Sequence, residues 1–91
     1  MLHIIKTCQA LNEAKLYATE QDAILLIEDA VYAANERHYA FPVACHAPLF
    51  ALRSDLEARA ITTLISPHIR VIGYDGFVDL TVTHSQSMTW E

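Results

Sequence analysis

Glycine and cysteine are scarce in this sequence, with two of each among 91 residues. Cys8 and Cys45 have no CxxC spacing and form no disulfide framework, which favours a reducing cytoplasm. Gly73 and Gly76 are too few to build a glycine-rich phosphate loop. The sequence also lacks a GxSxG elbow and any other pattern that pairs a nucleophile with a base. These absences argue against the common nucleotide-binding and hydrolase motifs.

Positive charge is also scarce. Six Lys and Arg residues stand against eleven Asp and Glu residues, the net charge is −5, and no basic run occurs. Direct binding of nucleic acid by this chain is therefore disfavoured, and any link to RNA would pass through a partner. No apolar stretch is long enough to span a bilayer. Met1–Ile5 lacks a preceding basic region and a cleavage site, so we expect no secretory signal and a cytoplasmic protein.

Apolar residues, in contrast, are abundant. They make up 53% of the chain, and charged residues make up only 19%. The length predicts a single domain over residues 1–91 with a small core. Part of the apolar excess is therefore expected on a surface that another subunit covers.

Short β-like runs alternate with helical stretches along the chain. The four runs are Leu2–Lys6, Ala23–Ile27, Leu49–Leu52 and Ile69–Ile72. This alternation predicts an α/β fold with a parallel sheet and helices on both faces. Residues 35–48 are expected to form a long surface loop.

Three helices are expected between and after the strands. The first carries an apolar stripe from Ala10 to Ala18 that includes Tyr17. The second opens with a capping box between Ser54 and Glu57 and extends to about residue 64. The third follows Gly73 and should turn one face to the sheet, made of Tyr74, Phe77, Val78 and Thr81.

Two features indicate an interface. Residues 30–34 are apolar all round, and a chain this short can hardly enclose such a helix. Trp90, next to the last residue, should be pinned to this domain or to a neighbour. The predicted partner interface therefore contains Asp29, Val31, Tyr32 and Trp90.

Glu28 and Asp29 close the second predicted strand. Ligands of open α/β sheets gather at the carboxyl ends of strands, so this pair could hold a metal or act as a base. The simpler interpretation, which we favour, is that Asp29 caps the following helix. A third metal ligand is not evident from the spacing.

The cysteines are weak candidates for catalysis. Cys8 follows the first strand, where a thiolate near a helix N-terminus could carry a persulfide. The alternative is a small, partly buried residue of ordinary reactivity, since only Lys6 supplies positive charge nearby. Cys45 adjoins His46, and together with His38 they could suggest zinc, but the four closely spaced ligands of structural zinc are missing. We therefore predict no catalytic residue, cofactor or metal, with Cys8 retained as the weak candidate.

Several segments, in order, resemble the TusB/DsrH family. They are Met1–His3, the run from Ala23 to Ala34, the run from Leu52 to Ala60, the run from Ile72 to Thr81, and Trp90. The resemblance spans nearly the whole chain outside residues 35–48. It implies a three-layer α/β/α DsrE-like fold with a small, mostly parallel sheet. It also implies a heterohexamer with TusC/DsrF-like and TusD/DsrE-like subunits, two copies of each.

In the Tus system, such a complex passes persulfide sulfur toward 2-thiolation of the wobble uridine of certain tRNAs. In the Dsr system, it serves sulfur oxidation. DsrH-type members carry a cysteine in the first helix where this chain has Ala14, and the family usually has glycine at Ala30 and Ala60. The missing cysteine makes the chain more similar to TusB and predicts a non-catalytic subunit. The alternatives are a DsrH-like subunit in sulfur oxidation, an active sulfurtransferase using Cys8, and a homo-oligomeric module binding a ligand near Glu28 and Cys8.

Overall fold

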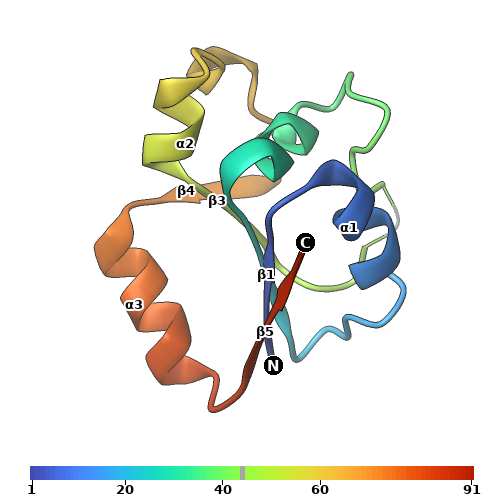
Figure 1. The fold of residues 1–91 in the computed structure, drawn as a ribbon, viewed down its shortest axis with the longest axis vertical. Coiled ribbons are helices and arrows are strands. Elements are labelled where there is room, and N and C mark those ends of the chain that lie inside the picture. Colours follow the sequence, from blue (N-terminus) through green and yellow to red (C-terminus); the bar gives the residue numbers. More distant parts are fainter. Residues whose placement is uncertain (44) are drawn as a thin grey trace.

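A five-stranded parallel sheet forms the centre of the protein (Figure 1), in a computed structural model that describes residues 1–43 and 45–91. The strand order is β4-β3-β2-β1-β5, and every neighbouring pair is parallel. The strands are β1 (Leu2–Ile5), β2 (Ala23–Leu26), β3 (Leu49–Leu52), β4 (Ile69–Ile72) and β5 (Ser87–Trp90). The four predicted strands are confirmed, and the first two end one residue early. Strand β5 was not predicted, because its short, largely exposed sequence carries no apolar run.

Helices cover both faces of this sheet, as predicted. On one face lie α1 (Cys8–Ala14), the 3-10 helix η1 (Glu28–Ala34) and α2 (Arg53–Ala58), followed by the short 3-10 helix η2 (Thr62–Leu64). On the other face lies α3 (Tyr74–Thr83), which Figure 1 shows apart from the others. The α/β fold with a parallel sheet and two helical layers is thereby confirmed.

The two faces enclose separate apolar clusters. The larger cluster joins Leu11 of α1, Val31 of η1 and Leu56 of α2 to the sheet, all three fully buried. The smaller cluster consists of buried Leu2, Ala23 and Leu25, against which α3 packs two partly buried side chains, Phe77 and Leu80. No residue of α3 is itself buried.

The interface prediction for residues 30–34 is wrong in one respect. Ala30, Val31, Ala33 and Ala34 are all fully buried within this chain. Three of the four are alanines, so the tight 3-10 helix is small enough to fit between α1 and α2. Val31 consequently offers no surface to a partner, and Tyr32, which is 39% exposed, is the reachable apolar residue of η1.

Helix α1 is shorter than predicted. It ends at Ala14, and Tyr17, expected in its buried stripe, is 68% exposed. Helix α3 begins after Gly73 as predicted, but of the face expected against the sheet only Phe77 packs there. Tyr74 and Val78 point to solvent instead.

The capping box predicted for α2 is also wrong. Ser54 lies inside the helix, where its hydroxyl donates to the Tyr74 hydroxyl at 3.2 Å. The helix then stops at Ala58, well before residue 64. Ala60 adopts a left-handed φ of 55°, and its N–H donates to the Glu57 carbonyl at 3.1 Å.

Together with a second bond, this turn forms a Schellman motif. The Ile61 N–H donates to the Leu56 carbonyl at 3.2 Å, and both side chains belong to the larger apolar cluster. The residue at the left-handed position of such a motif is usually glycine. The glycine that the resemblance implies at Ala60 therefore has a local conformational reason.

Candidate functional site

The strand order indicates where a ligand or partner group would gather. The chain steps from β1 to β2, β3 and β4 in one direction, and then α3 returns it to the opposite side of β1 to form β5. This reversal creates a switch point between β1 and β5. In open α/β sheets, ligands bind outside the carboxyl ends of the strands at such a point.

Lys6 occupies this switch point, one residue beyond β1. Its Nζ lies 2.7 Å from Oε1 of Glu91 and 3.4 Å from Oε2 of Glu28. The hydrogen bond that Lys6 donates to Glu91 and the charges of both carboxylates raise the pKa of Lys6. Lys6 is thus a fully charged ammonium that two acidic side chains already engage.

Cys8 begins α1 at the same edge. The helix is capped by Thr7, whose Oγ1 accepts a hydrogen bond from the Ala10 N–H at 3.0 Å. The Cys8 Sγ donates to the carbonyl of Asp29 at 3.6 Å. Partial burial raises the pKa of the Cys8 thiol, the charge of Asp29 raises it further, and a backbone N–H of Ala33 opposes both. The thiol therefore stays protonated at neutral pH, whereas sulfur transfer requires a thiolate.

Glu28 and Asp29 lie near Cys8 but bind different residues. Glu28 has an unusual left-handed φ of 50°, and its N–H donates to Oδ2 of Asp55 at 2.7 Å. The capping prediction for Asp29 is wrong, since Ile27 is the N-cap residue of η1 and makes no side-chain cap bond. Asp29 instead accepts two hydrogen bonds from Arg59, at 3.1 and 3.0 Å.

Arg59 completes a small polar cluster beside Asp29. Its guanidinium lies 6.0 Å from the centre of the Tyr32 ring and also binds the carbonyl of Asp55 at 3.2 Å. The predicted interface residues Asp29 and Tyr32 therefore lie together, and the Asp29 side chain is 74% exposed. No group of three or more His, Cys, Asp or Glu side chains in residues 1–43 and 45–91 is arranged to hold a metal ion.

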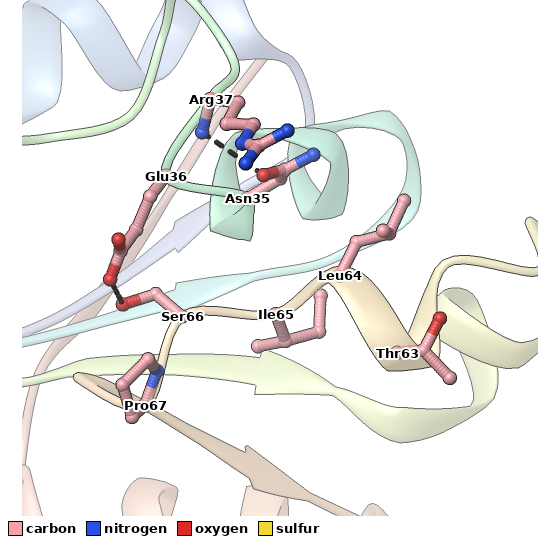
Figure 2. Close-up of a pocket in the computed structure, with 8 residues that line it drawn as sticks. All are labelled: Asn35, Glu36, Arg37, Thr63, Leu64, Ile65, Ser66 and Pro67. Carbon is pink, nitrogen blue, oxygen red and sulfur yellow. Dashed lines mark hydrogen bonds between the residues drawn. The ribbon is translucent and has the colours of Figure 1, made fainter.

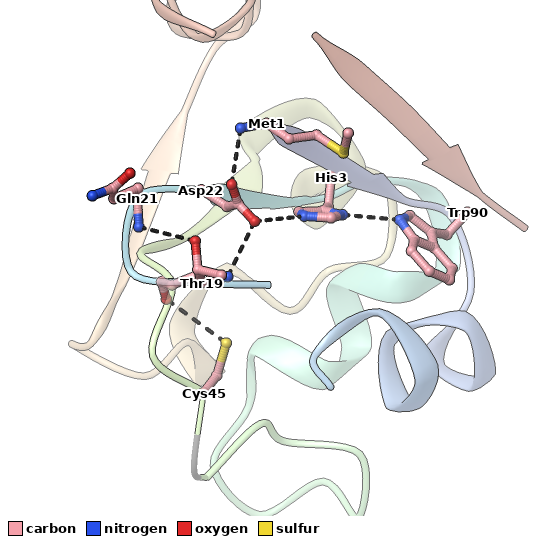
Figure 3. A network of polar contacts seen from close by, with 8 residues as sticks. Met1, His3, Thr19, Gln21, Asp22, Cys45 and Trp90 are labelled. Atoms are coloured by element: carbon pink, nitrogen blue, oxygen red, sulfur yellow. Dashed lines mark hydrogen bonds and ion pairs between the residues drawn. The ribbon is translucent and has the colours of Figure 1, made fainter. Parts of the chain in front are cut away.

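A buried polar network around His3 was not predicted from the sequence, apart from the fixed position of Trp90. His3 is 97% buried and lies between Asp22 and Trp90 (Figure 3). Its Nε2 is 3.1 Å from Oδ2 of Asp22, and the Trp90 Nε1–H donates to its Nδ1 at 3.1 Å. Because the indole can only donate, Nδ1 carries no proton, and His3 is the neutral tautomer that donates from Nε2 to Asp22.

Asp22 is the anionic end of this network. Its Oδ1 accepts a hydrogen bond from the N-terminal ammonium of Met1 at 2.9 Å, and its Oδ2 accepts another from the Thr19 N–H at 3.1 Å. These bonds, with the one from His3, hold the pKa of Asp22 far below its usual range, and the ammonium contributes most. The network confirms that Trp90 is pinned to this domain. In the sequence, the one signal for this network was that both Met1–His3 and Trp90 belong to the segments that resemble the family.

A hollow of about 370 Å³ lies over this network. Tyr17 stacks on Trp90 there, with ring centres 6.0 Å apart, and Met1 and Met88 complete an apolar rim. The nitrogen atoms of His3 and the oxygen atoms of Asp22 already have partners within the chain. The hollow therefore offers mainly apolar surface.

A second hollow, of about 270 Å³, lies between two loops (Figure 2). Its polar groups bind one another: the Ser66 hydroxyl donates to Glu36 at 2.8 Å, and the Arg37 N–H donates to the Asn35 side chain at 3.0 Å. The bond between Ser66 and Glu36 fastens the loop after η1 to the loop after η2. It indicates a structural role for the hollow.

The remaining cysteine and histidine candidates lie in local contacts. The Cys45 Sγ donates to the carbonyl of Ala47 at 3.8 Å, and His38 Nδ1 accepts from the Ala40 N–H at 3.1 Å. His46 is exposed. The structure therefore does not bring His38, Cys45 and His46 together as the ligands of one site.

No helix in the described part of the chain is long and apolar enough to cross a membrane.

Comparisons with known proteins agree on one family. The model of the DsrH like protein family matches residues 6–87. A protein named Protein TusB from Photorhabdus laumondii is 40% identical over 79 residues, which cover 85% of this chain and 82% of that relative. Protein TusB from Erwinia tasmaniensis is 36% identical over 96 residues and covers 99% of this chain and 100% of the relative. Protein TusB from Serratia proteamaculans is 42% identical over 71 residues, which cover 76% of this chain and 75% of that relative.

Proposed function

The chain belongs to the DsrH-like protein family, and from this membership we propose that it is a non-catalytic subunit of a sulfur-relay complex. The complex resembles TusBCD, with TusC/DsrF-like and TusD/DsrE-like partners, and acts in the cytoplasm. It passes persulfide sulfur for 2-thiolation of the wobble uridine of tRNA. The relatives named Protein TusB support this choice over sulfur oxidation.

The main support for a non-catalytic role is that neither Ala14 nor Cys8 offers a reactive thiol. Ala14, at the position of the DsrH-type cysteine, is fully buried and has no sulfur to offer. Cys8 is hydrogen-bonded to a carbonyl, its pKa is raised, and the nearby cation Lys6 is engaged by two carboxylates. A persulfide carrier needs the opposite environment, which lowers the thiol pKa.

Co-expression with the two proposed partner subunits tests the structural role. We expect a stable heteromer by size-exclusion chromatography with light scattering. A chain that stays monomeric beside folded partners would contradict the proposal.

Cysteine replacement in the complex tests the absence of a sulfur-carrying role. Cys8→Ser should leave tRNA thiolation unchanged, with Cys45→Ser as the matched control. Loading the complex with a cysteine desulfurase, followed by alkylation and mass spectrometry, should find no persulfide on Cys8. Loss of thiolation together with a persulfide on Cys8 would replace the proposal with an active sulfurtransferase.

A further inference from the structure

Helix α3 carries an apolar stripe on its outer side. Tyr74, Val78 and Val82 follow one another at intervals of four residues, which places them on one face of the helix. They are 65%, 58% and 78% exposed. The two valines are branched aliphatic side chains of the kind that proteins normally bury.

The helix cannot roll to hide this stripe. Phe77 and Leu80 already occupy the side that faces the sheet. Gly76 lies so close to β4 that a Cβ there would be 2.8 Å from the Cβ of Ile72. The stripe can therefore be covered only from outside the chain.

Negative charge borders the stripe on one side. Asp75 and Asp79 are one turn apart, and both are exposed. Helix α3 contains no Lys or Arg, and within the part of the chain that the structure describes neither carboxylate forms an ion pair. The Oδ1 of Asp75 accepts a local hydrogen bond, from the Gly76 N–H at 2.9 Å.

We infer that the outer face of α3 is a docking surface for a helix of a different protein. Its apolar ridge would run along Tyr74, Val78 and Val82, and its Lys or Arg residues would lie beside Asp75 and Asp79. Rows of side chains spaced by four residues are the ridges that pack into the grooves of a partner helix. This inference rests on the proposed function and adds to it a surface and the chemistry of the partner.

Charge argues against a second copy as the occupant. Two α3 helices face to face would bring four aspartates together with no cation from either helix, and each chain carries a net charge of −5. Like charges across an interface disfavour association. A helix of ten residues is also only about 15 Å long, so the stripe would be the apolar centre of a larger interface.

Matched valine substitutions test the surface. Val78→Asn and Val82→Asn should each weaken binding to the purified partner subunits by about tenfold or more, measured by calorimetry. Val43→Asn, at a valine that is 85% exposed outside α3, should leave the affinity unchanged. Asp79→Lys should weaken binding several-fold and reduce its dependence on salt. Urea unfolding of each variant verifies that the fold is kept, and the second valine variant decides the result if the first is unstable.

The outcomes separate this inference from the proposed function. If the wild-type chain binds no partner, the proposed function fails. If the wild-type chain binds and folded Val78→Asn and Val82→Asn bind equally well, only the docking inference is overturned. If the isolated wild-type chain dimerises and Val78→Asn abolishes the dimer, the occupant is a second copy and the inference is also overturned.

Discussion

The helices on the two faces of the sheet bury their apolar residues to very different extents. On the face of α1, η1 and α2, Leu11, Val31 and Leu56 are fully buried, and the apolar residues of η1 are enclosed except for Tyr32. On the opposite face, α3 has no buried residue, although six of its ten residues are apolar or glycine. The protein therefore has one closed face and one open face.

This difference shows where the apolar excess of the sequence lies. The composition indicated that some apolar surface must be exposed, and the prediction that the alanine-rich η1 supplies this surface was wrong. Alanines bury little area and fit between neighbouring helices, whereas Tyr74 and Val78 are larger and remain outside. In so small a chain, the size of the side chains and the room available decide which apolar helix is enclosed.

The largest expected effect on stability comes from comparing the same substitution, valine to asparagine, on the two faces. Val31→Asn places an amide in the closed face, where it displaces apolar contacts and must find new hydrogen-bond partners. We expect it to destabilise the fold by about 3 kcal/mol or more. Val78→Asn on the open face should change stability by only about 0.5 kcal/mol. Urea unfolding followed by circular dichroism measures both, and equal effects would remove the distinction between the faces.

The next effect concerns the edge of the closed face, where Asp22 ties Met1, Thr19 and His3 together. Asp22→Asn removes the carboxylate and should destabilise the fold by about 1–2 kcal/mol at neutral pH, because hydrogen bonds to charged groups are the stronger ones. The folded-state pKa of Asp22 is held below its unfolded value of about 4. Its stabilisation is therefore present above pH 4 and is lost as the pH falls below it.

The pH dependence supplies the control for this prediction. The difference in unfolding free energy between the wild type and Asp22→Asn should shrink as the pH is lowered from 5 toward 2. A difference that stays constant over this range would mean that the carboxylate charge contributes nothing to the network.

Much of the fold was predictable, and the failures have physical causes. Strands β1 to β4 are apolar runs, and their alternation with helices predicted the parallel sheet. Strand β5 lies at an edge, where little burial is required and no apolar pattern marks it. The face of α3 was misjudged because periodicity finds a stripe but not the direction in which it points.

The candidate site was predictable only in part. Cys8 and Glu28 do lie at the carboxyl edge of the sheet, as the strand pattern predicted. The network was missed because His3 and Trp90 are 87 positions apart in the sequence, and their pairing depends on β5 returning beside β1. Such contacts follow from topology, which no local pattern contains.

Smaller effects are expected at the two alanines where the resemblance implies glycine. Ala60 has a left-handed φ of 55°, so Ala60→Gly should relieve strain and stabilise the fold by about 0.5–1 kcal/mol. Ala30 is fully buried in η1, and Ala30→Gly should destabilise the fold by about 1 kcal/mol, through lost packing and added freedom of the unfolded chain. Thermal and urea unfolding of the two variants should shift in opposite directions, and shifts of the same sign would refute the assignment of Ala60 to a Schellman turn.

The smallest effect on stability is expected at Asp29, on the rim of the closed face. Its ion pair with Arg59 is largely exposed on the Asp29 side, and Arg59 keeps its bond to the Asp55 carbonyl when the pair is lost. Asp29→Asn should therefore change the unfolding free energy by about 0.5 kcal/mol or less. Its effect on partner binding is the informative measurement, because Asp29 and Tyr32 form the rival predicted interface. If Asp29→Asn weakens binding more than Val78→Asn does, the partner meets the rim of the closed face and not α3.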